Sequence, residues 1–210
     1  MPSIYQLKPA FQGLLRPFVR ALARAGATAN QVTVAAVLIA FAVGAALLAC
    51  PRREVLLLLP LALFLRMALN AIDGMLAREH GQMSKLGAVL NELGDVVADV
   101  AMYLPLALHP EFPAVPVVLV AVCAVVVEMT GVVGVQIGAS RRYDGPFGKS
   151  DRAFAFAALG LLLGLLLGLG VPGGAWIGWL LWLLLAASLW TVVNRARQAL
   201  AEVAGKEGAA

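Results

Sequence analysis

Residues 70–100 read NAIDGMLAREHGQMSKLGAVLNELGDVVADV, and they lie between two long apolar segments. This polar stretch places Asp73, Arg78, Asp95 and Asp99 close to, and partly inside, segments of membrane-spanning length. Ionisable groups are costly in hydrocarbon, so at such positions they mark either a functional site or a paired structural charge. A functional site and a paired structural charge of this kind both lie within helices embedded in a membrane. The rest of the chain also indicates such helices.

The composition places the chain in the membrane class. Of its 210 residues, 61% are hydrophobic and 13% are charged, and the mean hydropathy is +0.88. Soluble domains carry about 25% charged residues. The length favours a single domain over residues 1–210. Cys50 and Cys123 both lie in apolar runs, so we expect neither a disulfide framework nor a metal site from them.

Six apolar segments are long enough to cross a membrane, which takes about 20 residues. Short stretches with turn residues separate them, and they cover residues 31–50, 55–73, 86–108, 113–138, 153–171 and 174–193. None has the alternating pattern of a membrane barrel strand. The expected fold class is therefore all-α and polytopic, with six transmembrane helices within residues 31–193.

The N-terminal residues 7–25 are too interrupted by charge to span a membrane. Their apolar side chains share one helix face, and Arg16, Arg20 and Arg24 point elsewhere. This pattern is typical of an amphipathic helix that lies in the membrane interface. Two interpretations stay open: a positively charged topology anchor, and a lid or lateral wall of a lipid site.

The distribution of lysine and arginine predicts the orientation. Of the 16 such residues, 13 fall in the N-terminal segment, in the second and fourth connections between spans, and in the tail at 194–210. Arg52 and Arg53 lie on the opposite side, and Arg66 lies inside the second span. The positive-inside rule then places both termini and the polar stretch on the cytoplasmic side.

As two helices, the opening stretch has two polar faces. Asn70 and Asp73 share one face, and Asn91, Asp95 and Asp99 recur every fourth residue on the next helix. In an antiparallel hairpin these faces converge. Carboxylate and amide oxygens are ligands that Mg²⁺ and similar hard cations favour, so the sequence predicts an oxygen-rich pocket for such an ion.

Two charges lie deeper in the predicted spans. Arg66 and Asp99 are expected at matching depth, and a buried charge without a partner is costly, so we expect them to pair behind the pocket. Two alternatives stay open. Asp99 is a candidate metal ligand or base, and Glu128 is a competing partner for Arg66.

The spacing of these residues resembles the signature of the CDP-alcohol phosphotransferase family, D-x2-D-G-x2-A-R-x8-G-x3-D-x3-D. Every spacing is kept, and the corresponding positions are Asn70, Asp73, Gly74, Ala77, Arg78, Gly87, Asn91 and Asp95. The segment GATANQVT at 26–33 is similar to the family's G-x-T-P-N-x-x-T entry to its first span. Together with the six-span layout, it extends the resemblance to much of the chain.

The resemblance implies an activity and its partners. Such an enzyme transfers a phosphatidyl group from a CDP-linked lipid such as CDP-diacylglycerol to an alcohol acceptor, with Mg²⁺ or Mn²⁺ bound, and releases CMP in phospholipid biosynthesis. The resemblance also implies contact with membrane lipids and a bacterial inner-membrane location. Homodimers are common in the family, so a homodimer is one expectation. Nothing indicates a nucleic-acid partner.

The resemblance further implies residue roles. Metal ligation falls to Asp73, Asp95, Asn70 and Asn91, with Asp99 as an additional candidate, and Asp95 is the expected general base. Contact with the CDP moiety falls to Gly74, Ala77, Arg78 and Gly87. In the basic loop at 141–152, Lys149 and then Arg152 are candidate phosphate ligands. The alternative for this loop is a role in topology and in attracting anionic lipid headgroups.

This chain departs from the signature at two positions. The first and third aspartates of the signature are Asn70 and Asn91 here, so the carboxylates near the metal fall from four to two. We therefore expect one tightly held divalent ion rather than two. The alternative function is that of a family member with weakened or lost catalysis, which binds CDP-lipid or regulates a partner.

Overall fold

The computed structural model describes residues 7–165 and 174–208, and over these residues it contains helices and no strand. The α-helices are α1 (Leu7–Arg24), α2 (Ala29–Ala49), α3 (Leu58–Glu79), α4 (Lys85–Tyr103), α5 (Ala114–Gln136), α6 (Lys149–Leu165) and α7 (Ala175–Glu207). Two short 3₁₀ helices, η2 (Arg53–Leu57) and η3 (Leu104–Leu108), precede α3 and follow α4. The predicted all-α class is confirmed.

Local sequence explains where the helices begin. Thr28 forms a capping box with Gln31 at the start of α2, in which the Thr28 hydroxyl accepts from the Gln31 amide at 3.2 Å. The Ser84 hydroxyl accepts from the Gly87 amide at 2.9 Å and caps α4. Pro113 directly precedes α5. The first cap starts α2 within the entry segment at 26–33, and the second starts α4 within the signature.

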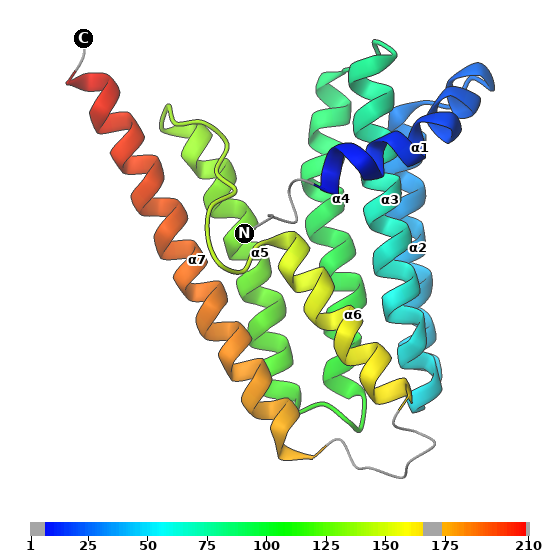
Figure 1. Cartoon of the computed structure of the whole chain (residues 1–210). Coiled ribbons are helices and arrows are strands. Elements are labelled where there is room, and N and C mark those ends of the chain that lie inside the picture. The colour runs from blue at the N-terminus through cyan, green and yellow to red at the C-terminus, as the bar shows by residue number, and fades with distance from the viewer. Residues whose placement is uncertain (1–6, 166–173, 209–210) are drawn as a thin grey trace.

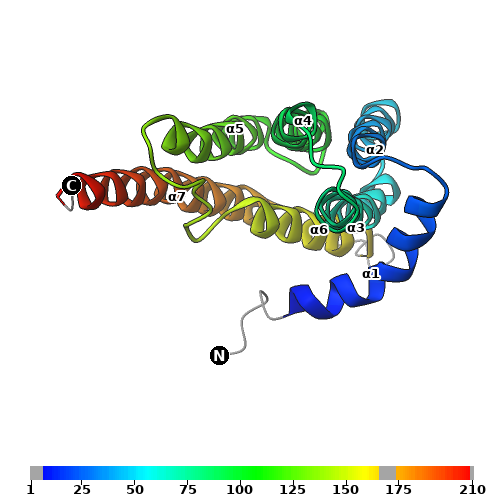
Figure 2. The ribbon, with the colours of Figure 1, turned by 90° about the horizontal axis from the view of Figure 1, so that it is seen from above.

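The helices form two layers. Viewed from above, α5, α4 and α2 lie in one row and α7, α6 and α3 in the other, while α1 lies outside α3 (Figure 2). The connection between α3 and α4, the start of the connection after α5, and the end of α7 all lie at the end of the bundle near α1 (Figure 1). The lysine-rich and arginine-rich connections therefore gather at one end.

Four helical segments are long and apolar enough to cross a membrane: Ala29–Ala49, Arg53–Glu79, Ala114–Gln136 and Ala175–Glu207. The protein is therefore an integral membrane protein. The polar α4 and the 17 described residues of α6 do not meet this criterion, so the six-span layout stays a prediction. The predicted end of the fifth span, at residues 166–171, lies outside the described residues.

The N-terminal helix α1 packs on α3 by one face. Leu15 and Val19 are buried against the apolar residues of α3, whereas Leu14 and Phe18 are exposed. A helix with one packed face and an adjacent exposed apolar flank suits a membrane interface. The location of α1 in the interface remains a prediction.

Helices α2 and α4 approach each other closely because small residues face the contact. A Cβ on Gly44 of α2 would overlap the Ala101 carbonyl oxygen of α4, and one on Gly94 of α4 would lie 3.0 Å from Val37 Cγ2 of α2. Small residues let helix backbones come together in membranes. This contact packs α2 on the face of α4 that carries Gly94 and Ala101.

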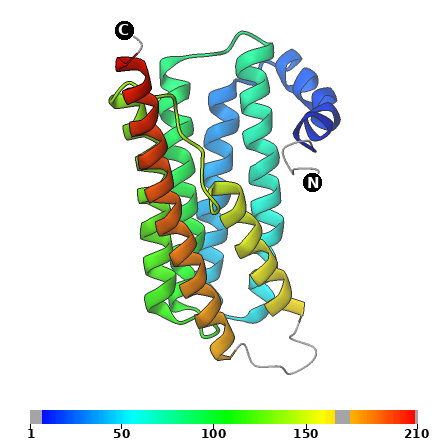
Figure 3. The ribbon, with the colours of Figure 1, turned by 60° about the vertical axis from the view of Figure 1, so that its left-hand side comes forward.

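The connection at 137–148 runs along α7 before α6 begins part-way along the bundle (Figure 3). The Phe147 amide donates to Thr191 Oγ1 at 3.0 Å, and the Ser140 amide donates to Glu202 Oε1 at 2.9 Å. Both acceptors are on α7. The last helix thus fixes the loop that carries the start of α6 into the bundle.

Candidate active site

The two signature helices meet at Asn70 and Asp95. Asn70 Nδ2 on α3 donates to Asp95 Oδ1 on α4 at 3.0 Å. The predicted convergence of the two polar faces is therefore confirmed at this pair. The contact exists because residue 70 is an amide: a second carboxylate there would have no hydrogen to donate and would repel Asp95.

Asp73 lies one turn along α3 from Asn70 and is buried, with 5% of its surface exposed. Thr33 Oγ1 of α2 donates to its carboxylate at 2.7 Å. Asp95 and Lys149 are also near enough to Asp73 for their charges to interact with its carboxyl group. Thr33 has no role predicted from sequence, although it ends the family-like entry segment at 26–33, and that segment is the signal that points to it.

Asn30, in the same entry segment, lies beside the Gly87 position. A Cβ on Gly87 would approach Asn30 Oδ1 to 2.8 Å. Glycine at 87 therefore leaves room for the Asn30 amide next to the first turn of α4. The entry segment contributes two oxygen-bearing side chains, Asn30 and Thr33, to the region where α2, α3 and α4 meet.

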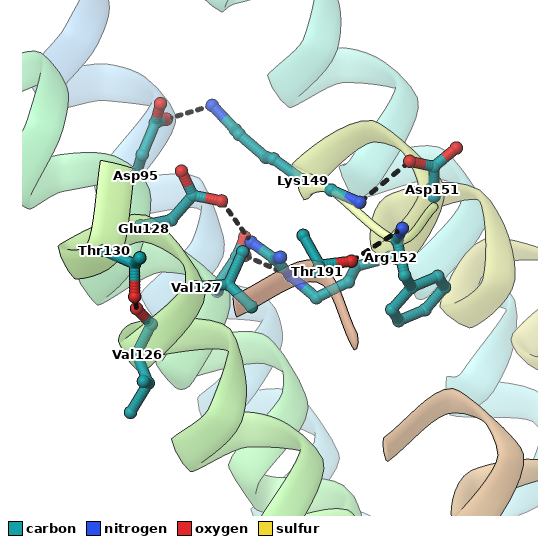
Figure 4. A network of polar contacts seen from close by, with 12 residues as sticks. Asp95, Val126, Val127, Glu128, Thr130, Lys149, Asp151, Arg152 and Thr191 are labelled. Carbon is teal, nitrogen blue, oxygen red and sulfur yellow. Dashed lines mark hydrogen bonds and ion pairs between the residues drawn. The ribbon is translucent and has the colours of Figure 1, made fainter. Parts of the chain in front are cut away.

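Asp95 is contacted by donors from two helices: Arg66 and Asn70 of α3, and Lys149 of α6. Lys149 of α6 forms an ion pair with Asp95 Oδ1. Arg66 Nη2 donates to the Asp95 carbonyl oxygen at 2.7 Å and lies 3.4 Å from its Oδ1. Figure 4 shows Asp95 and Lys149 pointing toward each other from α4 and α6. The Asp95 side chain keeps 21% of its surface exposed, so it is the more accessible of the two signature carboxylates.

Behind Asp95, Asp99 joins two arginines. Arg66 Nη1 donates to Asp99 Oδ1, which confirms the predicted Arg66–Asp99 pair. Arg152 Nη2 lies 3.0 Å from Asp99 Oδ2. All three side chains are at least 96% buried. Asp99 is thus shared by α3 and α6 through their arginines, and metal ligation by it would require these contacts to change.

Glu128 of α5, the alternative partner predicted for Arg66, contacts other arginines instead. Arg152 Nη2 lies 3.0 Å from Glu128 Oε1, and Arg195 Nη1 and Arg141 Nη2 each lie 3.3 Å from Oε2. Arg141 also pairs with Glu92 at 2.8 Å. From the sequence, Arg195 bears only on orientation and Arg141 only on the basic loop at 141–152. Neither is predicted to contact Glu128, because contacts between different helices and loops leave no local signal.

Other predicted residues lie at the rim. Arg78 is exposed at the end of α3, and a Cβ on Gly74 would lie 2.9 Å from its Nη2, so glycine leaves space for this guanidinium. Asn91 is exposed on the first part of α4. Arg152, by contrast, is fully buried, and as a phosphate ligand it would have to leave Asp99 and Glu128.

The oxygen donors suit one hard divalent ion better than two. Over residues 7–165 and 174–208, no three His, Cys, Asp or Glu side chains are grouped closely enough to hold a metal. Asp73 and Asp95 supply two carboxylates, and the asparagines add neutral amide oxygens that Mg²⁺ or Mn²⁺ accepts. Two negative charges balance one divalent ion, and Lys149 already adds a positive charge at Asp95.

A comparison with known proteins decides the family. The sequence profile of the CDP-alcohol phosphatidyltransferases matches residues 27–192, most of the chain. The chain belongs to the CDP-alcohol phosphatidyltransferase family. The predicted family is confirmed, and the match includes every position of the predicted signature. The roles of the individual signature residues stay predictions.

Relatives of this family member agree with it in sequence and in fold. Inner membrane protein YnbA of Escherichia coli (strain K12) is 44% identical over 201 residues, which cover 94% of this chain and 96% of YnbA. The crystal structure of Mycobacterium tuberculosis phosphatidylinositol phosphate synthase (PgsA1) with CDP-DAG bound has a TM-score of 0.70 at 24% identity. That likeness covers 89% of this chain and 92% of PgsA1. PgsA1 in complex with manganese and citrate gives a TM-score of 0.71, also at 24% identity, over 88% of each chain. At this identity the likeness establishes a shared fold.

Proposed function

We propose that this protein is a membrane transferase that moves a phosphatidyl group from a CDP-linked lipid such as CDP-diacylglycerol to an alcohol and releases CMP. One observation carries the proposal. This chain belongs to the family, and its signature carboxylate Asp95 on α4 contacts Asn70 on α3, one turn from the buried Asp73. The structure of PgsA1 with CDP-DAG bound supports the choice of donor.

Asp95 acts as the general base. Its carboxylate takes the proton of the acceptor hydroxyl, whose oxygen attacks the phosphorus that bears the diacylglycerol. The bond from that phosphorus to the bridging oxygen breaks, and CMP leaves with that oxygen. Lys149 pairs with Asp95 Oδ1 and would compete with the acceptor hydroxyl for the carboxylate, so Lys149 leaves Asp95 when the donor binds. The donor's pyrophosphate is then its counter-charge.

One divalent ion, Mg²⁺ or Mn²⁺, completes the site. Asp73 and Asp95 would hold it, with the amide oxygens of Asn70 and Asn91, and it would supply positive charge that stabilises the charge developing on the pyrophosphate. The complex of PgsA1 with manganese supports a divalent cofactor. Asp99 is excluded as an additional ligand in this proposal because Arg66 and Arg152 already engage it.

The CDP moiety lies along the end of α3 and the start of α4. Gly74, Ala77 and Gly87 line it with small residues, and Arg78, whose guanidinium lies over Gly74, donates to its phosphate from the exposed rim. Lys149, once released from Asp95, binds the pyrophosphate from the opposite side. A planar guanidinium and a mobile ammonium would thus hold the same anionic group.

The site faces the cytoplasm of a bacterium, from the inner membrane. The connections rich in lysine and arginine gather at the end of the bundle that carries the signature hairpin (Figure 1), and such connections stay in the cytoplasm. Cysteine at Ser150 is expected to resist a membrane-impermeant thiol reagent added to intact cells, and cysteine at Arg52 to react. Reaction at residue 150 with protection at residue 52 would reverse this orientation.

The test is release of CMP from CDP-diacylglycerol by the purified protein with Mg²⁺ or Mn²⁺ and a panel of alcohols. Asp73→Asn and Asp95→Asn each remove one carboxylate with little change of shape, and both are expected to abolish release. Glu79→Gln, an exposed acid-to-amide change at the end of α3, is the matched control and keeps full activity. Full activity of either aspartate variant overturns the assigned role.

A second candidate function is favoured by one observation. Asn70 directs its amide nitrogen at Asp95, so this contact forms without a metal ion. A family member that binds CDP-lipid without transferring it, and so senses or presents the lipid, would keep such a contact. Thermal stabilisation by CDP-diacylglycerol, with no CMP released for any alcohol, would identify this function.

A further inference from the structure

Three arginines from different parts of the chain converge on Glu128 of α5, the helix that packs beside the signature helix α4. Arg141 comes from the loop before α6, Arg152 from α6 and Arg195 from α7, and their guanidinium nitrogens lie 3.0–3.3 Å from the Glu128 oxygens. Arg152 and Arg195 are buried, with at most 1% of each residue exposed. A cluster of arginines of this kind is what a protein uses to bind a phosphate group.

In this chain a carboxylate already fills the cluster. Both oxygens of Glu128 are engaged, Oε1 by Arg152 and Oε2 by Arg195 and Arg141. Glu128 is on the helical backbone of α5 with 7% of its surface exposed, so it cannot swing into water. A phosphate bound here would leave that carboxylate buried beside a dianion and without its partners, which is strongly unfavourable.

The other basic side chains of the loop and the start of α6 are also compensated. Arg142 pairs with Asp144 at 2.7 Å and with Glu202 at 2.9 Å, and Lys149 pairs with Asp95. In the segment 141–152, all of which the structure describes, every lysine and arginine therefore has a carboxylate partner. Lys149 is the most exposed of these cations, with 30% of its side chain exposed, and its partner Asp95 is itself a signature residue.

We propose that the acceptor is an alcohol that carries no phosphate group, because Glu128 occupies the arginine cluster that would otherwise bind one. This inference rests on the proposed transferase function and names its acceptor class. The role of Glu128 is one of specificity: it contacts Arg141, Arg152 and Arg195 from within the chain and, together with Glu92 and Asp99, offsets their charge. The phosphate-binding role considered for Arg152 is thereby excluded for the acceptor, and Lys149 serves the donor.

The experiment compares wild type, Glu128→Gln and Glu92→Gln for binding of inorganic phosphate, followed by thermal stabilisation without donor or metal. Glu128→Gln releases the cluster from its carboxylate, and we expect phosphate to bind it about tenfold or more tightly than it binds wild type. Glu92→Gln removes a partner of Arg141 but leaves Glu128 in place, and it is expected to bind phosphate like wild type. Equal binding by all three proteins overturns the proposal.

A second measurement on wild type decides the matter if Glu128→Gln does not fold. CMP release is compared for polyols and their phosphomonoesters, for instance glycerol and glycerol 3-phosphate. Release with unphosphorylated alcohols and none with the matched phosphomonoesters is expected, whereas a preference for a phosphomonoester overturns the proposal. Failure of the transferase function itself has a different signature: no CMP with any alcohol, while the phosphate-binding comparison of the three proteins still gives its answer.

Discussion

Replacing Asp99 with asparagine is expected to destabilise the protein strongly, because this one carboxylate balances two buried arginines. Asp99→Asn keeps the shape of the side chain and removes its charge. Arg66 then keeps only its contacts to Asp95, and Arg152 keeps only Glu128. The amide nitrogen of the new asparagine also directs its hydrogens at a guanidinium group, which has no hydrogen-bond acceptor.

The geometry sets the magnitude. Unit charges 3.0 Å apart, the separation of Arg152 Nη2 and Asp99 Oδ2, interact by about 5.5 kcal/mol at an effective dielectric constant of about 20. The remaining carboxylates recover part of this energy. Removing one partner of a buried ion pair costs about 3–5 kcal/mol in general, and we expect a loss of unfolding free energy in that range for Asp99→Asn.

The assay is equilibrium unfolding in detergent micelles, with helix content as the signal. Glu79→Gln is the matched control, since it is the same acid-to-amide change in the exposed Arg16–Glu79 pair at 3.0 Å, and it is expected to leave stability unchanged within error. The double variant Arg66→Gln/Asp99→Asn removes one uncompensated charge and is expected to recover part of the loss.

An unfolding free energy for Asp99→Asn within about 1 kcal/mol of wild type would refute the reasoning, because an exposed pair would give the same result. A double variant less stable than Asp99→Asn alone would also contradict it. In that case Arg66 would stabilise the protein through Asp95 rather than through Asp99.

The double variant Asn70→Asp/Asn91→Asp is expected to bind more divalent metal than wild type and to lose thermal stability more steeply on chelation, because its added carboxylates repel one another without a second ion. Two tightly bound ions in wild type, counted by calorimetry without nucleotide, would contradict the single-ion proposal. Gly44→Ala is expected to destabilise the bundle by about 1–3 kcal/mol, since its Cβ would overlap the Ala101 carbonyl oxygen of α4. Gly205→Ala, at a helical position with open space around it, is the control and is expected to be neutral or slightly stabilising.

Sequence predicts the parts of this structure that depend on local spacing. Asn91, Asp95 and Asp99 recur at every fourth residue, which places them along one stripe of α4. The short connection after α3 makes an antiparallel hairpin, so Asn70 meets Asp95 as expected. The Arg66–Asp99 pair follows from matching depth and the high cost of an unpaired buried charge.

The convergence on Glu128 could not be predicted in this way. Its partners Arg152 and Arg195 lie 24 and 67 residues away, and periodicity along one helix says nothing about which other helix it faces. Positive charge in a loop indicates topology, a phosphate site and internal pairing equally well. Only the packing of α5 against α7 and the path of the loop distinguish these alternatives.

The fastening of the 137–148 connection to α7 has a consequence for biogenesis. A membrane protein is inserted from its N-terminus onward, and Glu202 leaves the ribosome 62 residues after the Ser140 that it holds. Until then the signature hairpin is complete, but the loop that delivers Lys149 to Asp95 has no fixed course. The nascent chain therefore carries the signature residues before it carries the helix that holds this loop, and a chain arrested before α7 would lack both contacts of the loop with α7. Docking of the last helix is thus the step that fixes the loop leading to Lys149.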